Sequence, residues 1–247
     1  MNMIFRKRPH SENIFRRCTD QECHLLNSKC GKLGICGKDE DGNIFKLCTS
    51  EDVFNWEVAV YLDMLEANIF PYVSTVGKLL TYSTKKLVSV RTFLKQQPRI
   101  NFTVFLHELY SFVNSFRKHC FLHGNLHVDN IFVHPTKFHT APRFFVIDYA
   151  NSFILKKRHS IPIYTRTSFM EEYDVKLKFT AFMDWDFITL HVSLKQMFFK
   201  QGERLCIIDN VITTYIKKES LEQGIRYYES TRLRSHEYPN ANSSFDL

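Results

Sequence analysis

Two short motifs near the middle of the chain carry the residues that say most about its fold. The first runs from His123 to Val133 and reads HGNLHVDNIFV, and the second runs from Phe144 to Ala150 and reads FFVIDYA. The apolar run of the second motif stops at Asp148, so the sequence predicts a strand with a carboxylate at its end. A polar loop and a carboxylate-ended strand therefore lie close together along the chain.

Together the motifs resemble the catalytic loop HRDLKxxN and the metal-binding DFG of protein kinases, or the HGDLHxxN variant of distant kinase-like phosphotransferases. The resemblance implies that Asn130 and Asp148 bind magnesium, because amide and carboxylate oxygens suit this hard ion. It also implies that Asn125 stands where the family has the Asp that accepts the proton of the attacking hydroxyl. An amide can orient a hydroxyl but has no basic lone pair to take its proton.

The resemblance gives roles to both histidines of the first motif. His123 is expected to be structural and to form hydrogen bonds under the loop. His127 replaces the usual Lys of protein kinases and matches the His of the HGDLH variant, so it contacts either the transferred phosphoryl group or only water. Ala150 replaces the DFG glycine, which disfavours large flips of the backbone at this point.

Upstream, the charged turn from Lys38 to Gly42 separates two predicted strands. Lys46 lies on the second strand and is expected to point inward beside Ile44 and Cys48. A lysine on a half-buried strand needs an anionic partner, since desolvating an ammonium alone is costly. The resemblance to the kinase strand VAIK supplies two partners, the phosphates of the nucleotide and a helix glutamate.

A helix is predicted to follow this strand. A hydroxyl cap with acidic residues in the first turn leads into Val53 to Ala67, where apolar residues recur at helical spacing, namely Phe54, Val58, Leu62 and Leu65. This helix resembles the kinase αC helix. Glu57 lies off the apolar stripe and is expected to turn toward Lys46, with a solvated surface charge as the alternative.

The segment from Lys29 to Gly37 takes the place of the glycine-rich loop of kinases. Two glycines of that pattern remain, Gly31 and Gly34. They would let backbone amides approach the phosphate oxygens of a nucleotide. The alternative is that they form an ordinary hairpin turn.

Further along, Leu79–Tyr82 and Leu87–Val90 are predicted to form a β-hairpin, with an interlobe hinge near Val90 to Thr92. The segment from Thr103 to His119 is a well-marked amphipathic helix that resembles kinase αE. Its apolar face consists of Phe105, Leu109, Phe112, Val113 and Phe116.

In the last third of the chain, Asp186 to Val192 resembles the kinase αF pattern, whose Asp accepts hydrogen bonds from the backbone of the catalytic loop. The stretch from Asp148 to Asp186 has the length of an activation segment, and it contains four candidate phosphosites, namely Tyr164, Thr165, Thr167 and Ser168. Further helices are predicted around Ile208 to Tyr215 and Leu221 to Tyr228.

With 247 residues and 44% hydrophobic content, the chain suits one large domain or two small lobes. The expected fold class is α+β, a bilobal protein-kinase-like fold. A small β-rich N-lobe with one αC-like helix covers residues 23–90, and a mainly helical, shortened C-lobe covers residues 92–237. A basic extension covers 1–22, and a polar tail expected to be disordered covers 238–247. The compact, divergent form resembles kinase-like proteins of large DNA viruses.

A formal net charge of +7 favours anionic partners such as nucleotide phosphates or acidic protein surfaces. The basic runs at Arg6–Arg8, Arg16–Arg17 and Lys156–Arg158 are short and lack an aromatic base-stacking pattern. They are therefore interpreted as solvated surface rather than as a nucleic-acid site.

The seven cysteines are an odd number, and no secretory signal or stretch of transmembrane length accompanies them. We therefore expect reduced thiols in the cytoplasm or nucleus, in a host cell if the protein is viral, rather than a disulfide framework. Five cysteines fall within the first fifty residues, but their spacing fits no CxxC knuckle, so buried or free thiols are favoured over a zinc site.

The resemblance thus predicts a protein that binds ATP and Mg²⁺ between two lobes. Two main functions remain open, namely phosphotransfer to Ser or Thr of a protein substrate, impaired by Asn125, and a pseudokinase that binds a protein partner. The HGxLHxxN form also suggests a small-molecule kinase. A basic nucleic-acid binder without bound nucleotide is the remaining alternative.

Overall fold

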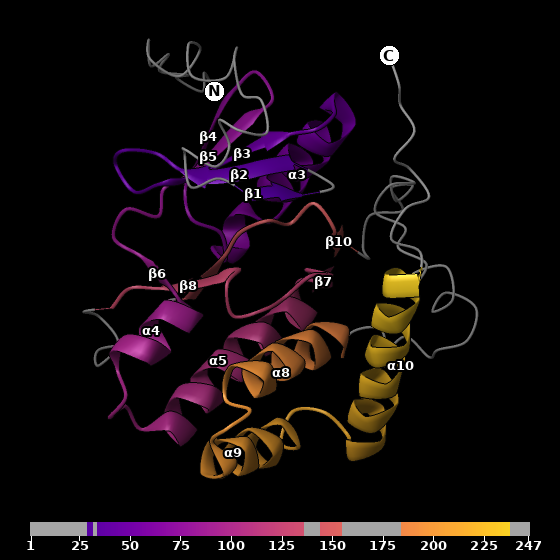
Figure 1. Cartoon of the computed structure of the whole chain (residues 1–247). Coiled ribbons are helices and arrows are strands. Elements are labelled where there is room, and N and C mark those ends of the chain that lie inside the picture. Colours follow the sequence, from indigo (N-terminus) through magenta and orange to yellow (C-terminus); the bar gives the residue numbers. More distant parts are fainter. Residues whose placement is uncertain (1–28, 32–33, 136–143, 155–183, 238–247) are drawn as a thin grey trace.

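The computed structural model describes residues 29–31, 34–135, 144–154 and 184–237, with only the backbone described at 29–31 and 230–237. An antiparallel sheet with one long helix lies at one end of the molecule, and a group of helices lies at the other (Figure 1). The predicted extension 1–22, the phosphosites between 164 and 168, and the tail 238–247 lie outside the described residues and stay predictions.

The sheet has five strands in the order β1-β2-β3-β5-β4. The strands are β1 (Lys29–Gly31), β2 (Gly34–Lys38), β3 (Ile44–Cys48), β4 (Val73–Val76) and β5 (Leu79–Tyr82). The predicted hairpin between β2 and β3 is confirmed. Its turn is fixed by the carboxylate of Asp39, which accepts a hydrogen bond from the Asn43 N–H at 2.8 Å, and by Gly42, whose φ of 81° favours glycine.

The second predicted hairpin is wrong. Strand β5 pairs with β3 and β4, whereas β6 (Val88–Ser89) pairs with β8 (Ile131–Val133), which in turn pairs with β9 (Phe144–Val146). The chain therefore leaves the five-stranded sheet directly after Tyr82. Helix α4 (Val90–Gln96) begins in the segment Val90 to Thr92, where the hinge was expected, and the hinge stays a prediction.

Helix α3 (Glu51–Asp63) packs on the sheet and begins at Ser50, whose hydroxyl accepts from the Val53 N–H. A short 3-10 helix, η1 (Leu65–Ala67), follows it. Of the predicted apolar stripe, Phe54 and Val58 are half-buried and pack against the core, but the other two members are exposed. Leu62 is 44% exposed and Leu65 is 55% exposed, while the residues that face the core are Val53, Glu57, Val60 and Met64. Glu57 thus lies on the buried stripe of the helix.

Helix α5 (Phe102–Lys118) confirms the predicted amphipathic helix. Its side chains Phe105, Leu109, Val113 and Phe116 are at most 2% exposed. It packs against α8 (Trp185–Met197) and α9 (Gly202–Ile212), and α10 (Lys218–Glu237) packs against α8 (Figure 1). Two short strands, β7 (Phe121–Leu122) and β10 (Phe153–Ile154), pair beside the loop that contains the first motif.

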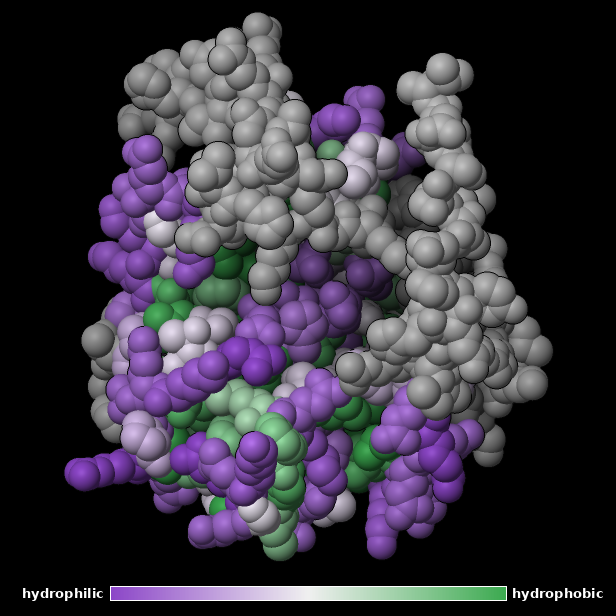
Figure 2. Space-filling model, in the orientation of Figure 1, coloured by the Kyte–Doolittle hydropathy of each residue, from purple (hydrophilic) through white to green (hydrophobic). Residues whose placement is uncertain are grey.

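Apolar side chains of both parts form one continuous core. Hydrophilic residues dominate the described part of the face in Figure 2, and hydrophobic residues appear there in separate areas. Among the residues that the structure describes, no helix combines the length and the apolarity that crossing a membrane requires.

Candidate functional site

The site is centred on the ammonium of Lys46. Its Nζ lies 2.5 Å from Glu57 Oε1 on α3 and 2.5 Å from Asp148 Oδ1, directly beyond β9. Lys46 is 2% exposed and Glu57 is fully buried, whereas the Asp148 side chain is 31% exposed. The structure therefore brings together three predicted site residues, two of which are 102 positions apart in the sequence.

The charges of these three groups depend on one another. Burial lowers the pKa of Lys46, but the two carboxylates raise it by more, so the ammonium stays charged. Burial raises the pKa of Asp148, but the charge and hydrogen bond of Lys46 bring it below its usual value of 3.8. For Glu57, burial outweighs Lys46, and its pKa lies above 4.5. The positive charge is thus held in place, and Asp148 is the more readily ionised carboxyl.

A residue that sequence reasoning missed also holds Glu57. The hydroxyl of Tyr82 on β5 donates a hydrogen bond to Glu57 Oε2 at 2.8 Å, and Tyr82 is 1% exposed. Glu57 therefore has a different partner on each carboxylate oxygen, with Lys46 on Oε1. No pattern in the sequence links Tyr82 to Glu57, because their contact depends on how β5 pairs within the sheet.

The carboxylate of Asp186, in the first turn of α8, binds the backbone of the first motif. Its two carboxylate oxygens accept hydrogen bonds from the N–H groups of His123, at 2.7 Å, and Gly124, at 2.9 Å. Burial raises the pKa of Asp186 to about 7, although these two bonds lower it. The bonds are the ones that the resemblance of Asp186–Val192 to αF led us to expect. They fix the loop on helix α8.

His123 connects this loop to the segment after β9. Its Nε2 lies 2.9 Å from the Ile147 carbonyl, and its Nδ1 lies 3.3 Å from the Asn125 N–H. Burial lowers the pKa of His123 to about 4. The neutral ring that carries its proton on Nε2 satisfies both contacts, because Nε2 then donates and Nδ1 accepts. His123 therefore has the structural position that the sequence predicted.

Asn130 and Asp148 lie at the same end of the hairpin formed by β8 and β9. The Asn130 carbonyl accepts a hydrogen bond from the Ile147 N–H at 3.0 Å, and its side-chain Nδ2 donates to the Asn125 carbonyl at 3.0 Å. The Nδ2 bond fixes the orientation of the Asn130 amide. Asp148 has a φ of 60°, a left-handed conformation that is unusual for a residue other than glycine and that clusters at functional sites.

This donor set fits a magnesium ion. Asn130 retains its amide oxygen, and Asp148 retains Oδ2 after Oδ1 contacts Lys46. Within the described residues, no three His, Cys, Asp or Glu side chains gather around one point. Two protein oxygens suit magnesium, because this ion usually keeps several waters and is completed by phosphate oxygens of the substrate.

The backbone around Asn125 is fixed independently of its side chain. Its N–H contacts His123 and its carbonyl accepts from Asn130, while the side chain is half-buried. Asp129, the nearest carboxylate in the motif, forms a two-pronged ion pair with Arg91 at 2.7 and 2.9 Å. Asp129 therefore faces the start of α4 and is not oriented to replace a base at position 125.

The position of His127 disfavours a charged ring. Burial lowers the pKa of His127, so it does not reproduce the charge of the Lys that it replaces.

The two predicted glycines lie next to the Lys46 strand. Gly31 pairs with Gly34 at the end of the β1–β2 hairpin. A Cβ on Gly34 would lie 2.7 Å from the Leu47 carbonyl and 3.1 Å from Cε of Lys46, so only glycine leaves room for the lysine side chain here.

The position of Gly124 leads to a prediction on stability. Its φ is 78°, and a Cβ there would lie 2.3 Å from the Asn151 carbonyl oxygen. We expect Gly124→Ala to lower the free energy of unfolding by about 2–4 kcal/mol, from backbone strain plus crowding. Denaturant titration measures this loss. Gly42→Ala is the matched control, because Gly42 has a φ of 81° and no atom within 4 Å of its Cβ position.

The control should lose only about 1 kcal/mol, the cost of a left-handed residue alone. Equal losses in the two variants would contradict close packing between Gly124 and Asn151.

In comparisons with known proteins, the chain matches no protein-family model and no curated protein sequence. Among solved structures it is similar to one described as WaaP in complex with acyl carrier protein. The TM-score is 0.47 and the sequence identity is 11%, over 95% of this chain and 99% of that chain.

Proposed function

We propose that this chain is a kinase-like protein that binds ATP with magnesium at Lys46, Asn130 and Asp148. The observation that carries the proposal is the Lys46 ammonium, held at 2.5 Å from both Glu57 and Asp148 in a site with little solvent. A buried charge with this geometry needs a reason, since burying ion pairs rarely adds stability. A site for phosphate groups supplies that reason.

In this proposal Lys46 binds nucleotide phosphates, and Glu57 and Tyr82 hold the lysine in position. The amide oxygen of Asn130 and the free oxygen of Asp148 hold magnesium, which would neutralise part of the phosphate charge when bound. Asp186 and His123 keep the loop at a fixed distance from Asp148. Positioning and electrostatics, which dominate phosphoryl transfer, are thereby retained.

Asn125 favours a second candidate function, that of a pseudokinase. The amide of Asn125 orients an acceptor hydroxyl but takes no proton from it. Asp129 is engaged by Arg91 and does not replace the base. The chain would then act as a nucleotide-responsive module for a protein partner, whereas the first function requires a protein substrate with a Ser or Thr acceptor.

The test of nucleotide binding is thermal unfolding with and without ATP and magnesium. At a hundredfold excess over Kd, ligand binding adds about 2.7 kcal/mol, which for a chain of this size raises Tm by roughly 5–10 °C. We expect this rise for the natural chain and its loss in Asp148→Ala. Asp41→Ala is the matched control, because Asp41 is exposed and its ion pair with Lys85 lies at the surface.

A natural chain whose Tm does not respond to ATP and magnesium would overturn the proposal. A full response in Asp148→Ala would show that Asp148 does not hold the metal.

A further inference from the structure

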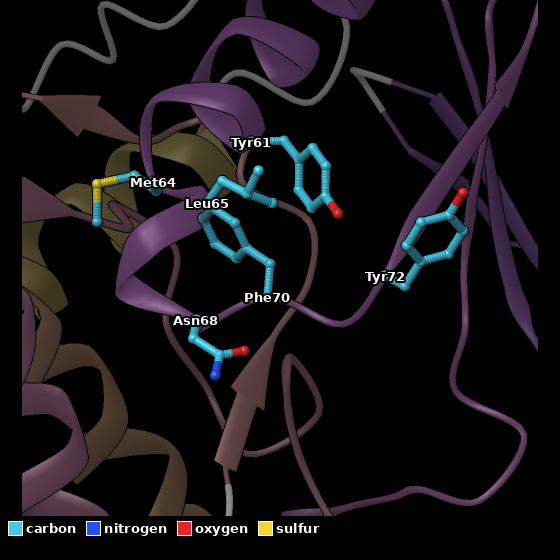
Figure 3. Close-up of a pocket in the computed structure, with 6 residues that line it drawn as sticks. All are labelled: Tyr61, Met64, Leu65, Asn68, Phe70 and Tyr72. Atoms are coloured by element: carbon cyan, nitrogen blue, oxygen red, sulfur yellow. The ribbon is translucent and has the colours of Figure 1, made fainter. Parts of the chain in front are cut away.

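Large apolar side chains are exposed at the end of helix α3 and in the 3-10 helix η1 that follows it. Leu62 on α3 and Leu65 on η1 are 44% and 55% exposed, and Tyr72 is 68% exposed. Beside them lies a groove with a volume of about 200 Å³, lined by Tyr61, Met64, Leu65, Asn68, Phe70 and Tyr72. Figure 3 shows Tyr61 and Tyr72 on opposite sides of the opening, with Leu65 and Phe70 together on the helix side. Two of these exposed side chains, Leu65 and Tyr72, line the groove, and exposed apolar residues around one groove indicate a binding surface.

Exposed acidic residues lie next to this groove in the sequence, and the segment from Glu51 to Ala67 contains no Lys or Arg. Two of the acidic residues, Asp63 and Glu66, are exposed and adjoin lining residues in the sequence. An occupant that combines apolar and basic residues would therefore complement the groove in both shape and charge.

The first residues of the chain have this composition. The tripeptide Ile-Phe-Arg occurs at residues 4–6 and again at 14–16, and each copy is followed by further basic residues, Lys7-Arg8 and Arg17. We propose that one of these two Ile-Phe-Arg segments docks in the groove of the same chain. The Phe side chain would fill the apolar groove, and the arginines would lie near Asp63 and Glu66.

The connection is long enough for this docking. Strand β1 begins at Lys29 on one edge of the sheet, and β4, which follows Tyr72, lies on the other edge. Five strands at about 4.8 Å spacing span about 20 Å. The residues between Arg16 and Lys29 reach up to about 40 Å when extended. The second copy of the motif therefore reaches the groove, and the first copy has still more chain available.

The groove is connected to Asp148 through contacts with the residues on either side of it in the chain. The Phe70 ring, which lines the groove, stacks on Tyr149 with ring centroids 4.3 Å apart, and Tyr149 directly follows Asp148. The Ile69 carbonyl also accepts a hydrogen bond from the Val146 N–H on β9 at 2.8 Å. Docking in the groove would therefore affect the position of Asp148. The effect on nucleotide binding rests on the proposed function, whereas the docking itself does not depend on it.

Photo-crosslinking of the full chain tests the proposal. A benzophenone amino acid is placed at position 65, where the exposed Leu65 can be replaced without disturbing the core. We expect a cross-link within one chain, at monomer mass, to a peptide from residues 1–17 identified by mass spectrometry. The same probe at the exposed position 104 on α5 is the matched control and should give no such peptide.

The double variant Phe5→Ser and Phe15→Ser should lower the cross-link yield roughly tenfold, the factor expected for losing one buried aromatic side chain. Cross-links at dimer mass would indicate a second copy in the groove and overturn the proposal. A full yield in the double variant, or no cross-link to residues 1–17, would overturn it as well. Because the experiment contains no nucleotide, its failure leaves the ATP proposal untouched, and the thermal test is read separately.

Discussion

Replacing Lys46 with methionine is expected to lower the free energy of unfolding by about 3–5 kcal/mol. Methionine fills a similar volume but leaves Glu57 fully buried and Asp148 partly buried without their shared positive charge. An unpaired buried carboxylate costs far more than the ion pair contributed. Denaturant titration at pH 7 measures the loss. Lys85→Met is the matched control, since Lys85 is 63% exposed and its ion pair with Asp41 is a surface one.

The control should change stability by at most about 1 kcal/mol, the usual value of an exposed ion pair. A loss in Lys46→Met as small as that of Lys85→Met would contradict the view that Lys46 neutralises the buried Glu57 and the partly buried Asp148. The same variant should also lose the ATP-dependent rise in Tm, because Lys46 is proposed to bind the phosphates.

The pH dependence of the Lys46→Met deficit has a definite sign. Burial already raises the pKa of Glu57 above 4.5, and removal of the ammonium raises it further. When a carboxyl has a higher pKa in the folded state than in the unfolded state, the protein loses stability as the pH rises above the unfolded-state pKa. In the natural chain Lys46 lowers the pKa of Asp148, which stabilises the folded state above the unfolded-state pKa, and the variant lacks this stabilisation. The deficit should therefore grow from about pH 4 to pH 7 and shrink in acid.

The sequence predicted the elements whose signal is local. Helix α5 was found from the spacing of its apolar residues, because one face of it is buried and the other is not. The β2–β3 turn was found from its charged, glycine-ended composition. The Asp186 contact was expected from its resemblance to a kinase motif, not from any local pattern.

The face of α3 and the pairing of β5 could not be predicted in this way. Helix α3 has apolar residues on two faces, and its buried face includes the charged residue Glu57, which is paired with Lys46. Apolar spacing alone therefore selected Leu62 and Leu65, which are exposed. Strand β5 pairs with β4, which precedes it by a two-residue turn, and with β3, over thirty residues earlier, and not with the segment that follows it.

The largest effect on activity is expected from Asn125→Asp. This change restores a carboxylate at the position of the missing proton acceptor, and a positioned general base contributes typically 10²–10⁴-fold to the rate. The loop should tolerate the change, because its backbone is held by Asp186, His123 and Asn130 and not by the Asn125 side chain. We therefore expect magnesium-dependent phosphate transfer from radiolabelled ATP to rise by about this factor over the natural chain.

Two further variants separate a restored base from a simple change in charge. Asn210→Asp adds the same charge on α9, at an exposed position away from the loop, and should leave transfer unchanged. Lys46→Ala in the Asn125→Asp background should abolish the gain, because the phosphates lose their positive partner. If Asn125→Asp binds ATP as the natural chain does but transfers no phosphate, the missing base is not what limits turnover. The pseudokinase function would then be favoured, and Lys46, Glu57 and Asp148 would serve binding alone.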